Sequence, residues 1–179
     1  ISWLINSGTN YLVSGQPQRR MGNQHPNIVP YQVFATKDGH LIVAAGNDAQ
    51  FSRLCGLLGR PDLAKDKDYQ SNQMRLRNRD SLIAILSEEI AGWARDALVA
   101  ALDTANVPGG AIHDVEDVFT SEQVKARDMK ITMEHPKAGQ AGVELIGNPV
   151  KFSKTKVSYR RPPPMCGEHN EEIMAELAA

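Results

Sequence analysis

Five consecutive residues carry the side chains best suited to binding chemistry: Gly22, Asn23, Gln24, His25 and Pro26, which we call the 22–26 loop. Glycine permits close approach of the backbone to a ligand. Side-chain amides and an imidazole can donate hydrogen bonds to an oxyanion or a carboxylate. The same composition also suits a plain turn, so composition alone leaves both interpretations open.

Other patterns for catalysis or metal binding are absent from the sequence. It contains no phosphate-binding glycine loop, no dinucleotide fingerprint and no nucleophilic-serine elbow. The histidines are isolated from one another, with no pair spaced to share a metal ion on a helix: His25, His40, His113, His135 and His169. We therefore predict no metal site and no permanently bound cofactor.

Three arginines at alternate positions could bind phosphate. Their spacing favours salt bridges instead, because several aspartates lie nearby in the sequence. The arginines are Arg75, Arg77 and Arg79, and the aspartates are Asp66, Asp68 and Asp80.

The composition is that of an ordinary globular protein, with 41% hydrophobic and 23% charged residues. The formal net charge is −1 with both signs spread along the chain, which argues against a nucleic-acid partner. No apolar run approaches the roughly 20 residues of a membrane-spanning helix, so we predict no membrane partner. Cys55 lies in an apolar stretch far from Cys166, which is typical of an inert buried thiol and of a reducing, cytoplasmic location.

The elements that must position the 22–26 loop are predicted from hydrophobic spacing. A helix over residues 1–14 ends at Gly15, before Pro17. Two strands, 29–35 and 40–45, flank an Asp-Gly pair that is typical of a tight hairpin. The order of elements predicts an α+β fold rather than regular βαβ alternation. The remaining predicted elements are helices over 47–59, 79–90, 94–105, 115–127 and 168–177, an extended segment at 111–115, and strands at 131–135 and 143–146.

Residues 19–34 read RRMGNQHPNIVPYQVF. This string resembles the R-x-G-N-x-H-P-x-x-x-P-Y-x-x-F segment of class III CoA-transferases, the family named for L-carnitine dehydratase and bile-acid-inducible protein F. The match continues in register with LGRPDL, VPGGA, NPVKFS and PPMCGEH further along the chain. Two positions depart from the family pattern: Ala111 stands where proline is common, and Cys166 replaces the usual leucine.

The resemblance implies an α+β small domain over residues 28–115, in which an antiparallel hairpin or sheet packs with helices. Residues 1–27 would form a connecting helix and the Gly-Asn-x-His-Pro loop. Residues 116–179 would form the C-terminal return segment to a large Rossmann-like domain, which in the family precedes the matched region and is absent from this chain. The missing initiator methionine likewise predicts a fragment of a longer protein.

The family moves CoA between an acyl-CoA and a carboxylic acid through an aspartyl-CoA intermediate. Its nucleophilic aspartate lies upstream of everything matched here, so no catalytic residue carries over and the chain alone is predicted to be inactive. In formyl-CoA transferases the matching loop covers the intermediate and contacts the acceptor carboxylate. The candidate substrate-binding residues are therefore Gly22, Asn23, Gln24, His25 and Pro26, although that subgroup has several glycines where this chain has one.

The resemblance further implies an interlocked homodimer in the cytoplasm, with coenzyme A as a substrate rather than a cofactor. Two alternatives stay open. The chain could be part of an α-methylacyl-CoA racemase, which shares the fold but transfers a proton at the α-carbon. It could also be a non-catalytic module that dimerises by itself.

Overall fold

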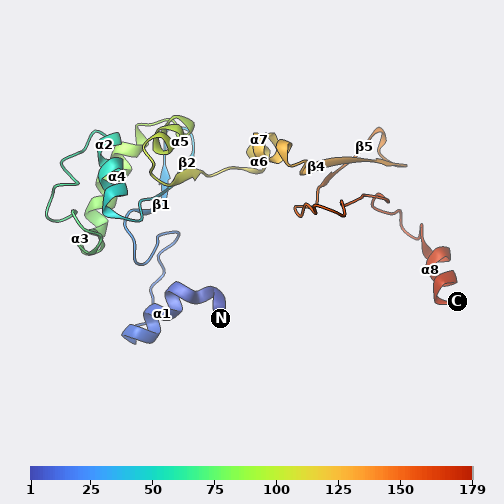
Figure 1. Cartoon of the computed structure of the whole chain (residues 1–179), viewed down its shortest axis with the longest axis horizontal. Coiled ribbons are helices and arrows are strands. Elements are labelled where there is room, and N and C mark those ends of the chain that lie inside the picture. The colour runs from blue at the N-terminus through green and yellow to red at the C-terminus, as the bar shows by residue number, and fades with distance from the viewer. Residues whose placement is uncertain (179) are drawn as a thin grey trace. The chain divides into compact units, whose positions relative to one another are not determined.

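The computed structural model describes residues 1–178. Two units are distinguished: an N-terminal unit, Ile1–Ile112, and a C-terminal unit that begins at His113. Figure 1 shows the elements of each unit, which are considered separately below. None of the helices in the described residues is long and apolar enough to cross a membrane.

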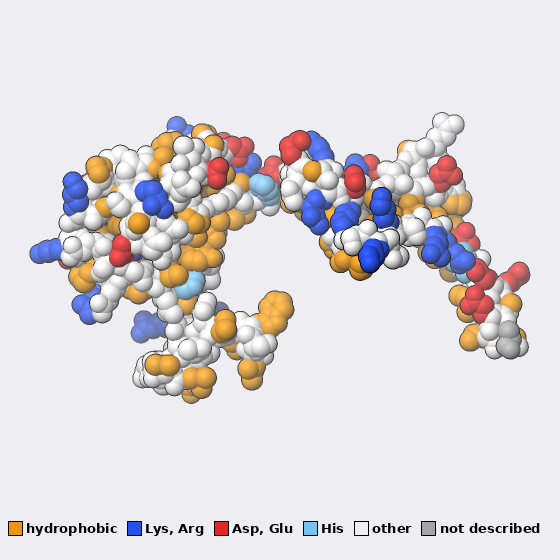
Figure 2. Space-filling model, viewed as in Figure 1, with side chains coloured by type: hydrophobic (Ala, Val, Ile, Leu, Met, Phe, Trp, Pro, Cys, Tyr) orange, Lys and Arg blue, Asp and Glu red, His pale blue; other side chains and the backbone are white. Residues whose placement is uncertain are grey.

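The chain begins with two consecutive helical segments, as predicted. A 3-10 turn, η1 (Ser2–Leu4), leads into α1 (Ile5–Ser14). Gly15 ends α1 in the left-handed region, at φ 68°, which glycine reaches without strain. Hydrophobic side chains of this segment face solvent, with Trp3 97% and Leu12 82% exposed (Figure 2).

A three-stranded antiparallel sheet forms one layer of the N-terminal unit. Its strands are β1 (Tyr31–Ala35), β2 (His40–Ala44) and β3 (Gly109–Ala111), in the order β1-β2-β3. The predicted hairpin is confirmed. The third strand begins two residues before the predicted extended segment. Glycine allows the pairing to start there, because an added Cβ at Gly109 would lie 2.8 Å from the Ile42 carbonyl oxygen.

Helices cover the sheet: α2 (Asp48–Leu57), α3 (Asn72–Arg77), α4 (Arg79–Ala91) and α5 (Arg95–Thr104). Asn47 caps α2, because its Oδ1 accepts a hydrogen bond from Gln50 N at 2.9 Å. The sequence predicts α2, α4 and α5 but not α3. That helix has a polar sequence without apolar periodicity, and Ser71 caps it.

The hydrophobic core lies wholly within the N-terminal unit, between residues 29 and 107. It joins the inner face of the hairpin to the apolar faces of α2, α4 and α5. Cys55 belongs to this core, which confirms that the thiol is buried, and burial raises its pKa to about 12, as expected of an unreactive thiol. Fully buried members include Leu41, Leu54, Leu82, Leu86 and Leu98.

The C-terminal unit consists of short elements. Residues 115–127 form two helices instead of the single one predicted, α6 (Val115–Thr120) and α7 (Glu122–Ala126). Ser121 separates them because its extended backbone ends α6 while its hydroxyl accepts from Val124 N and caps α7. An antiparallel pair, β4 (Lys130–His135) and β5 (Gly139–Ile146), follows, and α8 (Asn170–Leu177) comes last.

Candidate functional site

The 22–26 loop connects α1 to β1 through a tight turn. Gln24 N donates to Met21 O at 3.1 Å, and Gly22 lies in the left-handed region at φ 60°. A side chain at Gly22 would meet no atom within 4 Å, so the backbone conformation, rather than crowding, favours glycine.

The loop is tied to the outer edge of β1. His25 N donates to Tyr31 O at 2.9 Å, and Asn23 Oδ1 accepts from Val33 N at 3.0 Å. The His25 ring stacks on the Tyr31 ring, with centroids 5.0 Å apart. The loop therefore pairs with the free edge of the sheet and holds His25 against an aromatic face.

The hydrogen bonds of His25 determine its tautomer. Asn27 N donates to His25 Nδ1 at 3.1 Å, so in the neutral ring the proton resides on Nε2. Nε2 has no hydrogen-bond partner among residues 1–178. Burial, and secondarily the positive charge of Arg79, lower the pKa of His25. At neutral pH the side chain thus offers an uncharged N–H donor.

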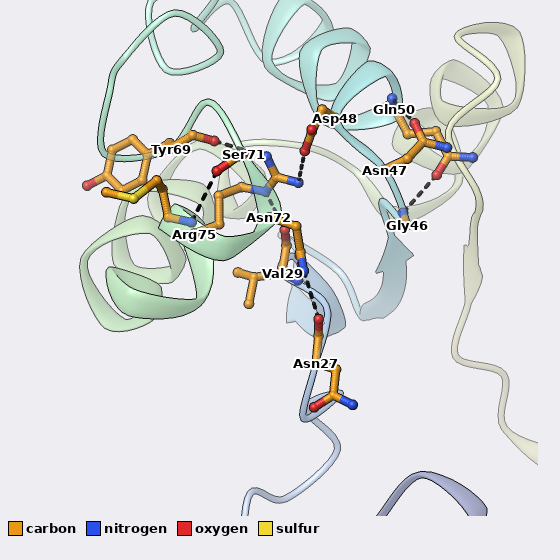
Figure 3. Close-up of polar contacts among 11 residues, drawn as sticks. Asn27, Val29, Gly46, Asn47, Asp48, Gln50, Tyr69, Ser71, Asn72 and Arg75 are labelled. Carbon is orange, nitrogen blue, oxygen red and sulfur yellow. Dashed lines mark hydrogen bonds and ion pairs between the residues drawn. The ribbon is translucent and has the colours of Figure 1, made fainter. Parts of the chain in front are cut away.

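Two side chains of α3 hold the backbone that follows the loop (Figure 3). Asn72 bonds it twice: Oδ1 accepts from Val29 N at 3.1 Å, and Nδ2 donates to Asn27 O at 2.8 Å. Arg75 Nε donates to Val29 O at 2.7 Å. From α1, Asn10 exchanges two side-chain hydrogen bonds with Asn27, each of 3.0 Å.

Arg75 is a fully buried cation with a complete set of partners. It donates to Tyr69 O at 2.9 Å and pairs with Asp48 Oδ1 at 2.7 Å (Figure 3). Its guanidinium carbon also lies 4.4 Å from the centroid of the Phe51 ring. The predicted salt bridge is therefore made, but to Asp48 rather than to the aspartates near it in sequence. Its interactions are structural: each of its three nitrogens donates within the protein, and the fully buried side chain offers no surface to a phosphate.

Two aspartates close to the loop in sequence are committed to structural contacts. Asp48 neutralises Arg75. Asp38 Oδ1 accepts from Arg95 N at 2.7 Å and from Thr36 Oγ1 at 3.3 Å, which ties the hairpin turn to the start of α5. The hydrogen bond from Arg95 lowers the pKa of Asp38. No group of three metal-ligating side chains is found in the described part of the chain.

Sequence reasoning found the loop but missed the side chains that hold it. Asn72 and Arg75 contact the segment after the loop, and Arg79 Nη2 donates to His25 O at 2.8 Å and to Pro26 O at 3.2 Å. The only local signal for them is the i, i+3 spacing of Asn72 and Arg75 on one face of α3, whereas Arg79 begins α4. It was obscured because the residues between α2 and α4 lack apolar periodicity.

The C-terminal unit contains a separate hollow between the end of α7 and the segment after β5. Its walls combine apolar and basic side chains, among them Arg127, Lys151, Phe152 and Lys156. Arg127 Nη2 donates to Pro149 O at 3.0 Å, so this cation braces the wall of the hollow.

Comparisons with known proteins match nearly the whole chain. The model of CoA-transferase family III matches residues 1–170. A succinate–glutarate CoA-transferase of Agrobacterium fabrum is 41% identical over 97% of this chain, and human succinyl-CoA:glutarate CoA-transferase is 37% identical over 99%. A crystal structure of a CAIB/BAIF family protein from Brucella suis aligns with a TM-score of 0.81 at 44% identity over 98% of this chain. The chain spans 43%, 40% and 45% of these three relatives, respectively.

Proposed function

The chain belongs to CoA-transferase family III, as the sequence resemblance predicts, and from this premise we propose that it is the C-terminal portion of an enzyme that moves CoA between an acyl-CoA and a carboxylic acid. The relatives that support this proposal are named for that transfer. Coenzyme A is a substrate in this reaction, not a resident cofactor.

We place the nucleophilic aspartate outside this chain, in the longer protein. Its carboxylate attacks the acyl-CoA thioester and expels CoA thiolate, leaving an acyl–aspartyl anhydride. The thiolate then attacks the aspartyl carbonyl, which releases the donor acid and gives an aspartyl-CoA thioester. The acceptor carboxylate repeats the sequence in reverse and leaves with CoA. The structural roles of Asp38 and Asp48 support an outside nucleophile.

The 22–26 loop is proposed to contact the carboxyl group that reacts at this aspartate. The observation that carries this role is the neutral His25 ring, whose Nε2–H is a donor without a partner among the described residues. Such a donor can stabilise the negative charge on an oxygen as the anhydride forms. Gly22 lets the backbone approach the same group, and Asn23 fixes the loop on β1.

The acids exchanged are proposed to be short dicarboxylates. Several relatives carry such acids in their names, including succinate–glutarate and succinyl-CoA:mesaconate CoA-transferases. The full-length protein is proposed to be a homodimer in the cytoplasm, and this chain alone is proposed to be inactive.

A transfer assay tests the proposal on the protein that joins this chain to its upstream domain. We expect succinyl-CoA and glutarate to give glutaryl-CoA and succinate, separated by liquid chromatography. Intact-mass measurement after acyl-CoA addition should show CoA bound to one aspartate outside this chain. No transfer to any of a panel of carboxylic acids would overturn the proposal.

The same preparation separates the two alternatives. Incorporation of deuterium from D2O at the α-carbon of a 2-methylacyl-CoA, without CoA transfer, would identify a racemase. A folded dimer of this chain in sedimentation, with no activity in any longer protein, would identify a stand-alone dimerisation module.

A further inference from the structure

Two side chains of α3 and the first side chain of α4 hold the backbone from the 22–26 loop to the start of the hairpin. Asn72 and Arg75 bind the main chain at residues 27 and 29, and Arg79 binds it at residues 25 and 26. Only Arg79 contacts the loop itself. Its Nη2 bridges two consecutive carbonyl oxygens, those of His25 and Pro26.

We propose that Arg79 is a positioning residue for CoA transfer, one that fixes the 22–26 loop so that the His25 ring presents its N–H to the reacting carboxyl group. The inference rests on the proposed role of the loop. Arg79 touches no substrate atom in this assignment, and it acts through the backbone and ring of His25.

Arg79 and Arg75 differ in how their positive charges are balanced. Arg75 is neutralised by Asp48, whereas Arg79 forms no ion pair with a carboxylate within 4.0 Å in the described residues. Its Nη1 is buried and has no hydrogen-bond partner there. Partial burial lowers the pKa of this guanidinium, which indicates a cost for holding the charge in place.

The charge of Arg79 has a consequence for the neighbouring ring. A cation beside an imidazole disfavours a second positive charge, and Arg79 contributes to the lowered pKa of His25. The same charge favours an anion near the loop, since its acidic neighbour Asp80 raises the pKa of the guanidinium without forming an ion pair within 4.0 Å. Arg79 therefore adds to the effect of burial in keeping His25 neutral, and makes its surroundings favourable for an acid substrate.

A purely structural clamp does not require an arginine at this position. Asn72 already holds the main chain on both sides of residue 28 without any charge. A structural role predicts that substitutions of Arg79 change stability and leave His25 and turnover unaffected. A positioning role predicts that the pKa of the His25 ring and the rate of CoA transfer change together.

The test uses two substitutions and a matched control. Arg79→Gln removes the charge and most donors, and Arg79→Lys keeps the charge but not the planar fork. Arg77→Gln makes the same change at an exposed arginine on α3. Histidine NMR titration is done on the 179-residue chain, with His25→Ala to assign the signal. CoA transfer is measured on the full-length protein, after circular dichroism has shown that each variant is folded.

In Arg79→Gln we expect the pKa of His25 to rise toward its ordinary value of 6.5. In the same variant kcat should fall at least about tenfold, because a loop displaced by about 1 Å misaligns the donor. The KM for acyl-CoA should change less than about twofold, because the affected step follows acyl-CoA binding. Arg79→Lys should keep the low pKa of His25 and recover part of kcat, and Arg77→Gln should match the wild type.

The outcomes separate the inference from the function on which it rests. An unchanged His25 titration in Arg79→Gln would overturn the inference whatever the kinetics show. A changed titration with a normal rate, while His25→Ala slows transfer, would also overturn it and leave the proposed function standing. If neither His25→Ala nor Arg79→Gln slows transfer, the proposed role of the loop fails, and the inference fails with it.

Discussion

The two units of this chain keep their shapes by different means. The N-terminal unit encloses a continuous apolar core, and within it one buried cation, Arg75, is fully partnered. The C-terminal unit has no buried hydrophobic side chain among its described residues and relies on one strand pair and on surface contacts. It leaves large apolar side chains open to solvent: Ile146, Phe152, Tyr159, Ile173 and Leu177.

This contrast indicates which unit can position a site by itself. The 22–26 loop belongs to the unit with the core, so its geometry follows from residues present in the chain. The C-terminal unit has no such core. Like α1, it displays apolar side chains that are costly in water, and the proposed upstream domain or a second copy would cover them. The predictions below test this difference.

Backbone protection should show the largest difference. In hydrogen–deuterium exchange of the monomeric chain, amides of α4 should exchange at least about a thousandfold more slowly than those of β4 and β5, because only α4 is anchored in a closed core. Peptide-resolved mass spectrometry measures both in one sample. Equal protection of the two regions would show that the C-terminal unit has stability of its own.

The same substitution should have unequal effects in the two units. Leu86 is fully buried in α4, whereas Leu145 in β5 is only partly covered. Leu86→Ala should cost about 2–5 kcal/mol in the free energy of unfolding, through lost contacts and a cavity. Leu145→Ala should cost less than about 1 kcal/mol. Urea denaturation measures both free energies of unfolding. The fluorescence of Trp93, which packs against the core, reports on Leu86→Ala, and circular dichroism reports on Leu145→Ala.

A substitution in the loop should affect the reaction without damaging the unit that carries it. His25→Ala should lower kcat for CoA transfer by about tenfold to a hundredfold in the full-length protein, because it removes one donor to a developing oxyanion. Its ring is half-buried at the surface of the unit, so the unfolding midpoint should change little. His169→Ala, a matched change in the C-terminal unit, is the control. An unchanged rate in His25→Ala would remove the functional assignment of the loop.

Elements of both units were predictable from the sequence: in the C-terminal unit, β4, β5 and α8 lie close to their predicted ranges. Apolar spacing located α1, α2, α4 and α5, and the Asp-Gly pair located the hairpin. Local preference and burial agree in the hairpin and in α2, α4 and α5, whereas α1 has no buried residue. The helix α3 was missed because it is held by the polar contacts of Asn72 and Arg75 rather than by an apolar face. Periodicity cannot reveal such contacts, since their partners lie about 45 residues away. The break between α6 and α7 was missed for a similar reason, because it depends on a single hydrogen bond, from Val124 N to the Ser121 hydroxyl.

The smallest effect is expected in the C-terminal unit, where an exposed ion pair contributes to holding α8. Arg161 Nη2 lies 2.7 Å from Glu172 Oε1, and this hydrogen bond lowers the pKa of Glu172 below its ordinary 4.5. A carboxyl group with a lowered pKa contributes stability that is fully present above pH 4.5 and is lost as the pH falls through its folded value. Exchange of α8 amides, corrected for the intrinsic pH dependence, should therefore accelerate modestly in that acidic window. Glu172→Gln should abolish the acceleration, whereas Glu171→Gln should not. A response of the same size in α4 would mean that the two units share their stability after all.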